Sequence, residues 1–150
     1  MPLDTERKVY FFEDLEIGLE AFSVHVVAGE DVELFARITG DRNPIHFDTA
    51  FAALTSFKTP IAHGLLTAGY ISTVYGMELP GPGAIFVGMS INFVGPVRAG
   101  DEVIASVRLV GLDAAKRRAH FTHACAVKGR AVLEGTAELM VPRRLATKAA

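Results

Sequence analysis

The chain has 150 residues, of which half are hydrophobic, and its formal net charge is −2 at pH 7. This length suits one domain over residues 1–150 whose core needs no disulfide or structural metal, and the charge argues against a nucleic-acid-binding surface. The single cysteine and an N-terminus without the apolar core of a signal peptide predict a cytoplasmic protein.

The first third of the chain predicts a strand followed by a helix. Residues 19–28 are rich in β-branched and aromatic side chains, as strands are. Residues 29–39 place apolar side chains at helical spacing, with acidic residues at the positively polarised N-terminal end of the helix. Gly40 suits the position just after a helix, and residues 49–54 predict a short second helix.

The loop over residues 39–48 reads Thr-Gly-Asp-Arg-Asn-Pro-Ile-His-Phe-Asp, which places a carboxylate, Asp41, five residues before an imidazole, His46. Pro44 disfavours a helical conformation at Asn43, so a turn holds both side chains. A turn can direct an acid and a base at one small volume, such as a water molecule. The alternative is a plain surface turn, but the apolar segment that follows favours a site beside the core.

The segment over residues 59–77 carries no charged side chain except a protonatable histidine, His63. At about 20 residues it is nearly long enough to span a bilayer, but proline, histidine and glycine interrupt the apolar run. We therefore predict a helix over residues 63–77 that is buried on all sides within the protein, with no membrane association.

Four segments with strand character fill most of the remaining chain: residues 84–94, 102–112, 118–127 and 131–141. Turn-forming residues separate them at hairpin spacing, so we expect an antiparallel meander in this order. Alternating apolar and polar side chains in the second segment indicate one buried and one partly solvated face. The pattern predicts an α+β fold in which a curved sheet wraps around the buried helix, followed by a flexible tail over residues 143–150.

Three motifs, taken in order, resemble those of the MaoC-like dehydratases and (R)-specific enoyl-CoA hydratases, which have the hotdog fold. The loop resembles their hydratase 2 motif, and the matching positions are Phe35, Gly40, Asp41, Asn43, Pro44, Ile45, His46 and Ala52. Residues 60–66 resemble the start of the family's central helix, and residues 97–103 resemble the turn before one of its strands. The resemblance covers nearly the whole chain.

The resemblance implies hydration of a trans-2-enoyl-CoA to the (R)-3-hydroxyacyl-CoA, or the reverse dehydration, with CoA as part of the substrate and no separate cofactor. This addition needs a held water, a base, an acid and a donor to the enolate oxygen. Asp41 is assigned as the general base, and His46 as the partner that orients the water and shares in proton transfer, although the two roles can be exchanged. Asn43 is expected to fix the loop.

Two further residues are assigned to the site. Gly64 is expected at the N-terminus of the buried helix, where an unpaired backbone N–H and the helix dipole suit a developing oxyanion. Its alternative role is to permit close packing of the helix. Ser72 matches a serine that the (R)-hydratases place near the acid–base pair, but it can equally bond to its own helix.

Other polar residues are given structural roles. His63 is expected to bond to the backbone, and Cys125 to be a small buried hydrophobe. His120 and His123 lie three residues apart in a strand and therefore point to opposite faces, so no metal site is predicted there.

Two other functions stay open: a hotdog thioesterase, and a non-catalytic subunit that binds acyl thioesters, because one fold hosts several functions. The intact pair of Asp41 and His46 favours the hydratase over both. A single curved sheet leaves a strand edge and part of an apolar face uncovered, so we also expect a homodimer or a multiple of dimers.

Overall fold

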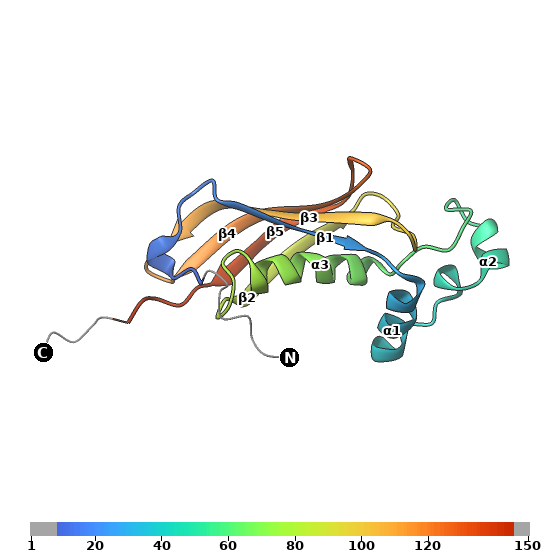
Figure 1. The fold of residues 1–150 in the computed structure, drawn as a ribbon, viewed down its shortest axis with the longest axis horizontal. Helices are drawn as coiled ribbons and strands as arrows, with labels where there is room; N and C mark the ends of the chain where they lie inside the picture. Colours follow the sequence, from blue (N-terminus) through green and yellow to red (C-terminus); the bar gives the residue numbers. More distant parts are fainter. Residues whose placement is uncertain (1–8, 146–150) are drawn as a thin grey trace, which may run out of the picture.

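A five-stranded antiparallel sheet curves along one long helix (Figure 1). The computed structural model describes residues 9–145. In chain order its elements are η1 (Phe12–Asp14), β1 (Glu20–Val26), α1 (Gly29–Thr39), η2 (Pro44–His46), α2 (Thr49–Ala53), α3 (Gly64–Met77), β2 (Ile85–Phe93), β3 (Glu102–Asp113), β4 (Arg118–Val127) and β5 (Arg130–Met140). The predicted α+β architecture, with a sheet around a central helix, is confirmed.

The local signals in the first third of the chain are confirmed. Helix α1 spans the predicted range, and Gly40 follows it with a left-handed φ of 81° that ends the helix. The N–H of Gly40 donates to the carbonyl of Ala36 at 2.8 Å. The short helix α2 begins after Asp48, whose side chain accepts hydrogen bonds from two backbone N–H groups of its first turn.

The expected four-strand meander is wrong at its first step, because β2 does not pair with β3. The sheet order is β1-β3-β4-β5-β2, so β2 lies at an edge beside β5, and β1 occupies the place next to β3. The backbone of residues 94–101 bonds elsewhere instead of closing a hairpin. The carbonyl of Val97 accepts from the N–H of Ala62 at 2.7 Å, and the N–H of Gly100 donates to Val27 at 2.7 Å. This connection therefore links the sheet to the segment that enters α3.

The side chains of β3 alternate between two environments, as predicted. The residues that face α3 are buried: Val103, Ala105, Val107 and Leu109. Their neighbours along the strand face outward and include Arg108, which pairs with Glu20 of β1. The sheet therefore has one buried face and one partly solvated face.

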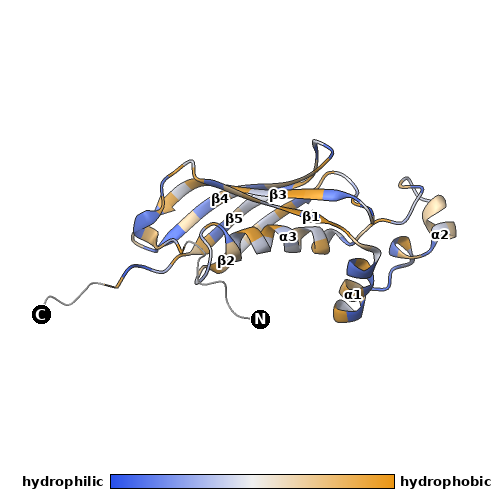
Figure 2. Cartoon of the chain, in the orientation of Figure 1, coloured by the Kyte–Doolittle hydropathy of each residue, from blue (hydrophilic) through white to orange (hydrophobic). Residues whose placement is uncertain are grey.

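Helix α3 is buried on one face only, which corrects the prediction of a helix buried on all sides. Ile71 and Tyr75 are fully buried, whereas Leu65 and Ser72 are exposed. Figure 2 shows hydrophobic residues along α3 and hydrophilic residues on α1. Within residues 9–145, no helix has the length and apolar character that crossing a membrane requires.

The two ends of the described chain are joined by an arginine. The guanidinium of Arg144 donates to Asp14 at 2.6 Å, and its backbone N–H donates to Glu13 at 3.0 Å. The predicted flexible tail over residues 143–150 therefore begins in a segment that is anchored to η1. Residues 146–150 of that tail lie outside the described part of the chain.

A buried polar pair lies between α3 and the sheet. The hydroxyl of Tyr75 and Nδ1 of His123 form a hydrogen bond of 3.0 Å, and both side chains are almost completely buried. Burial lowers the pKa of His123 below its ordinary value, and the nearby Ser90 carbonyl offsets only part of this effect. The folded protein therefore favours the neutral imidazole.

This shift predicts that the protein loses stability in mild acid. The unfolded chain binds a proton on His123 near the ordinary pKa of 6.5, before the folded protein does. The contribution of the neutral ring is therefore complete above that pH and is lost as the pH falls toward the lower native pKa. We expect the free energy of unfolding, measured between about pH 7 and about pH 5, to fall less steeply in His123→Leu than in the wild-type protein. Equal slopes in the two proteins would contradict this expectation.

Candidate active site

The loop between α1 and α2 is held by bonds between its own side chains and backbone. Oδ1 of Asp41 accepts from the N–H of Asn43 at 3.1 Å, and Oδ1 of Asn43 accepts from the N–H of Ile45 at 3.2 Å. The second bond caps η2, whose first residue is Pro44. Asn43 thus occupies the position from which it was expected to fix the loop, and the first bond leaves Oδ2 of Asp41 directed toward His46.

Asp41 and His46, called the dyad below, face each other across a gap that suits a bridging water. Oδ2 of Asp41 lies 4.0 Å from Nε2 of His46, which is too long for a direct hydrogen bond. Nδ1 of His46 donates to the carbonyl of Ile61 at 2.8 Å, so Nε2 carries the lone pair. Both atoms that face the gap are therefore acceptors, and one water can donate a hydrogen to each.

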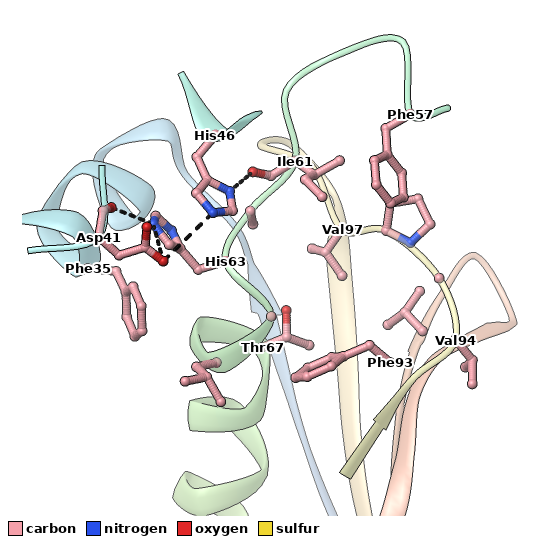
Figure 3. Close-up of a pocket in the computed structure, with 16 residues that line it drawn as sticks. Phe35, Asp41, His46, Phe57, Ile61, His63, Thr67, Phe93, Val94 and Val97 are labelled. Atoms are coloured by element: carbon pink, nitrogen blue, oxygen red, sulfur yellow. Dashed lines mark hydrogen bonds and ion pairs between the residues drawn. The ribbon is translucent and has the colours of Figure 1, made fainter. Parts of the chain in front are cut away.

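His63 lies behind the dyad, at the N-cap of α3, and its side chain is 2% exposed. Its Nε2 donates to the backbone carbonyl of Asp41 at 3.0 Å, which confirms the predicted bond to the backbone. Its ring also stacks on His46, with ring centres 3.7 Å apart, and lies 4.8 Å from the ring of Phe35. Figure 3 shows His63 beside Asp41 and beneath the loop that carries His46.

The three residues Asp41, His46 and His63 are close enough to suggest a metal site, since their potential ligand atoms lie within 4.8 Å of one another. Their geometry suits proton transfer better than metal ligation. Nε2 of His63 carries a hydrogen that it donates to a carbonyl, so its lone pair is not available. Because the two imidazoles are stacked, their nitrogen lone pairs lie side by side and do not converge on one point.

Gly64 is the first residue of α3 and lines the same cavity as the dyad. The first N–H groups of an α-helix have no acceptor within the helix, and the helix dipole makes that end positive. A Cβ atom at this position would lie 2.7 Å from a carbon of the Phe93 ring. Both roles considered for Gly64 are therefore compatible with the structure, because the missing side chain admits the Phe93 ring and the residue lies at the N-terminus of α3 in the cavity wall.

A cavity of about 530 Å³ opens beside the dyad and lies within the size range of small-molecule sites. Its walls combine the loop, the start of α3 and the ends of β2 and β5, and are mostly apolar. The lining residues are Phe35, Asp41, His46, Phe57, Ile61, Ala62, His63, Gly64, Leu65, Thr67, Phe93, Val94, Gly95, Pro96, Val97 and Val132. Figure 3 shows Asp41, His46 and His63 close together on one side of the cavity, and Phe93, Val94 and Val97 on the other side.

Ser72 is not brought to the dyad within one chain. It lies eight residues after Gly64, which corresponds to about 12 Å along the helix axis. The side chain is on the exposed face of α3 and is not part of the cavity wall. Any contact between this serine and a dyad has to come from a second copy of the chain.

The remaining polar candidates lie away from the cavity. His123 points inward to Tyr75, and His120 lies on the other face of β4, as their spacing predicted. Cys125 is completely buried, and burial raises the pKa of its thiol to about 12, so it is a poor nucleophile. Phe93 and Thr67 line the cavity, but sequence reasoning did not find them because no local pattern distinguishes them from other strand and helix residues.

Comparisons with known proteins find relatives that act on acyl thioesters, in agreement with an acid–base site beside an apolar cavity. A protein-family model described as the MaoC like domain matches residues 13–130. The 3-hydroxybutyryl-CoA dehydratase of Methylorubrum extorquens is 48% identical over 93% of this chain and 88% of its own length. The (R)-specific enoyl-CoA hydratase of Rhodospirillum rubrum is 46% identical over 91% of this chain and 94% of its own. The solved (R)-hydratase from A. caviae has a TM-score of 0.83 and 38% identity, over 87% of this chain and 99% of that one.

Removing either of the two acceptors that face the gap is predicted to abolish most hydration activity without unfolding the protein. Asp41→Asn and His46→Ala should each lower kcat/KM by about 10²-fold or more, the size expected for lost acid–base catalysis. The double variant should be little worse than the poorer single variant, because the two residues act on one water. Steady-state kinetics and thermal unfolding of each variant test this.

Asp48→Asn provides a matched control, because Asp48 is the last residue of the same loop and its carboxylate caps α2. It should retain nearly full activity. Folded dyad variants with nearly normal turnover would remove Asp41 and His46 from the mechanism.

Proposed function

The chain belongs to the MaoC-like domain family, and we propose that it is a hydro-lyase that hydrates trans-2-enoyl-CoA to (R)-3-hydroxyacyl-CoA and catalyses the reverse dehydration. The observation that carries this proposal is the dyad, whose two acceptor atoms face one gap beside an apolar cavity. We propose that no cofactor takes part, because acid–base groups and a hydrogen-bond donor suffice for the reaction and CoA is part of the substrate.

In the hydration direction, the bridging water adds to C3 of the enoyl thioester. Oδ2 of Asp41 takes one proton from the water while Nε2 of His46 holds the other hydrogen, which directs the oxygen lone pair at C3. The C2–C3 π electrons move toward the thioester, whose carbonyl oxygen becomes negative. Asp41 then delivers its proton to C2, so that one H and one OH have been added and the enzyme is returned unchanged.

We assign the negative charge of the enolate to the N-terminus of α3. Gly64 lines the cavity at the positive end of the helix, and in this proposal its backbone N–H donates to the thioester oxygen. The absence of a side chain lets the carbonyl approach the backbone. A donor of this kind typically contributes about 10²-fold to 10³-fold in rate.

The depth of the cavity supports a short acyl chain. Along α3 the cavity wall ends at Thr67. Ile71, Val74 and Tyr75, one to two turns further, are fully buried between the helix and the sheet. A long acyl chain directed along α3 would have to displace these side chains, whereas a four-carbon chain would not need to reach them. The relative from Methylorubrum extorquens is likewise named for a four-carbon substrate.

Crotonyl-CoA, the four-carbon trans-2-enoyl thioester, tests both the reaction and the chain length. We expect its enoyl absorbance to disappear without release of a thiol, and chiral analysis to give the (R)-3-hydroxy product. Because buried side chains of α3 leave no room for a longer acyl chain along the helix, kcat/KM for the twelve-carbon thioester should be at least about 10²-fold lower than for crotonyl-CoA. Thiol release would indicate a thioesterase instead, and binding without turnover would indicate a non-catalytic acyl-thioester-binding subunit.

We further propose that two copies of the chain associate through β2. This strand lies at a sheet edge, carries no charged side chain, and exposes apolar residues on both faces, including Ile85, Phe86 and Val87. The opposite edge, β1, also exposes apolar residues, but it carries the charged Glu20, which pairs with Arg108 of β3. An apolar edge with unpaired backbone groups invites pairing with another strand, and two-fold symmetry allows both copies to be covered.

Two valines with similar exposure test the choice of edge. Val87 on β2 is 47% exposed and Val24 on β1 is 51% exposed. Val87→Lys should shift the protein toward monomers in sedimentation experiments, because it places a charge in an interface expected to bury more than about 1,000 Å². Val24→Lys should leave the dimer intact. A wild-type protein that sediments as a fully active monomer would refute the proposed assembly.

A further inference from the structure

His63 contacts both members of the dyad and adjoins the proposed oxyanion donor. Its Nε2 bonds to the backbone of Asp41 at 3.0 Å and lies 3.9 Å from the carboxylate oxygen of the same residue. Its ring stacks on the imidazole of His46 with ring centres 3.7 Å apart. The next residue in the chain is Gly64, so His63 is covalently fixed to the start of α3.

The burial of His63 is difficult to explain by stability alone. Its side chain is 2% exposed, and its Nδ1 has no hydrogen-bond partner among the described residues. A buried polar atom without a partner destabilises the folded protein, and a hydrocarbon ring of similar size would avoid this cost. As an N-cap residue His63 also provides no side-chain cap for α3. The polar ring is therefore better explained by its other nitrogen, Nε2, which bonds to the backbone carbonyl of Asp41.

We propose that His63 is a positioning residue that sets the distance between the dyad and the N-terminus of α3. The bond to Asp41 places the carboxylate, the stacked ring places His46, and the peptide link places both relative to the N–H of Gly64. Hydration needs these groups to meet one thioester, in which C3 and the carbonyl oxygen are separated by a fixed number of bonds. This inference rests on the proposed hydratase activity.

Two substitutions separate the two contacts of His63. His63→Phe keeps a flat ring that can stack on His46 but removes the bond to Asp41. His63→Gln removes the ring but places an amide N–H near the position of Nε2. Because a misplacement of about 1 Å can cost about 10²-fold in rate, we expect kcat on crotonyl-CoA to fall at least about tenfold in His63→Phe. KM should change less than about twofold, and His63→Gln should recover part of the lost kcat.

A matched control is available at His25. Its ring also stacks on an aromatic ring, that of Tyr70 at 4.3 Å, and its Nε2 also bonds to an acidic residue, Asp31 at 3.2 Å. It does not line the cavity. His25→Phe should therefore leave kcat within about twofold of the wild-type value. Thermal unfolding should show that His63→Phe stays folded, since removal of an unpaired buried nitrogen offsets part of the cost of the lost bond to Asp41.

The combination with Asp41→Asn tests whether His63 acts through Asp41. In that background His63→Phe should cause little further loss of kcat, because the carboxylate that His63 positions no longer works as a base. Normal turnover of a folded His63→Phe, or an equal loss of kcat in both backgrounds, would overturn the proposal. A failure of the hydratase assignment looks different, because the wild-type protein itself would then not convert crotonyl-CoA to a hydroxyacyl product.

Discussion

The packing of α3 against the concave face of the sheet fixes the geometry of the site. The inner face of the helix, around Tyr75, is fully buried against the strands, so the N-terminus of α3 has one position relative to the sheet. Gly64 lies at that end, and His63 reaches from it to the carbonyl of Asp41. The dyad loop stands beyond the end of the sheet (Figure 1) and takes its position from this contact. Core packing and the placement of reacting groups are therefore two consequences of one interaction.

The hydrogen bonds around the dyad determine what it can do. One oxygen of Asp41 is occupied by the loop backbone, and one nitrogen of His46 is occupied by the carbonyl of Ile61. Each residue thus presents one acceptor to the gap, and the cavity that these acceptors line is otherwise mostly apolar. A water held by two acceptors is oriented for addition, and the same groups in their protonated forms can assist its removal. One arrangement therefore serves both directions of a reversible hydration.

Much of the loop that carries the dyad could be predicted from the sequence, because the residues that determine its conformation are close together in the chain. The left-handed Gly40, the side-chain bonds around Asn43 and the start of α3 near His63 follow from capping and turn chemistry within a few residues. The pairing of β2 with β5 could not be predicted, because the order of strands along the chain does not say which strand lies at the edge. The backbone of residues 94–101 also bonds elsewhere instead of forming a hairpin between β2 and β3. The exposed face of α3 and the contact of Phe93 with Gly64 are likewise tertiary features that no sequence period encodes.

The central claim is that the dyad and the N-terminus of α3 act on one enoyl thioester, and a crystal structure with a non-reacting four-carbon acyl-CoA analogue tests it most directly. We expect the thioester oxygen to lie within about 3.1 Å of the backbone nitrogen of Gly64. We also expect C3 to face the gap between Asp41 and His46, with the acyl chain ending near Thr67. A thioester oxygen directed away from α3, or an acyl chain that lies outside the cavity, would contradict it.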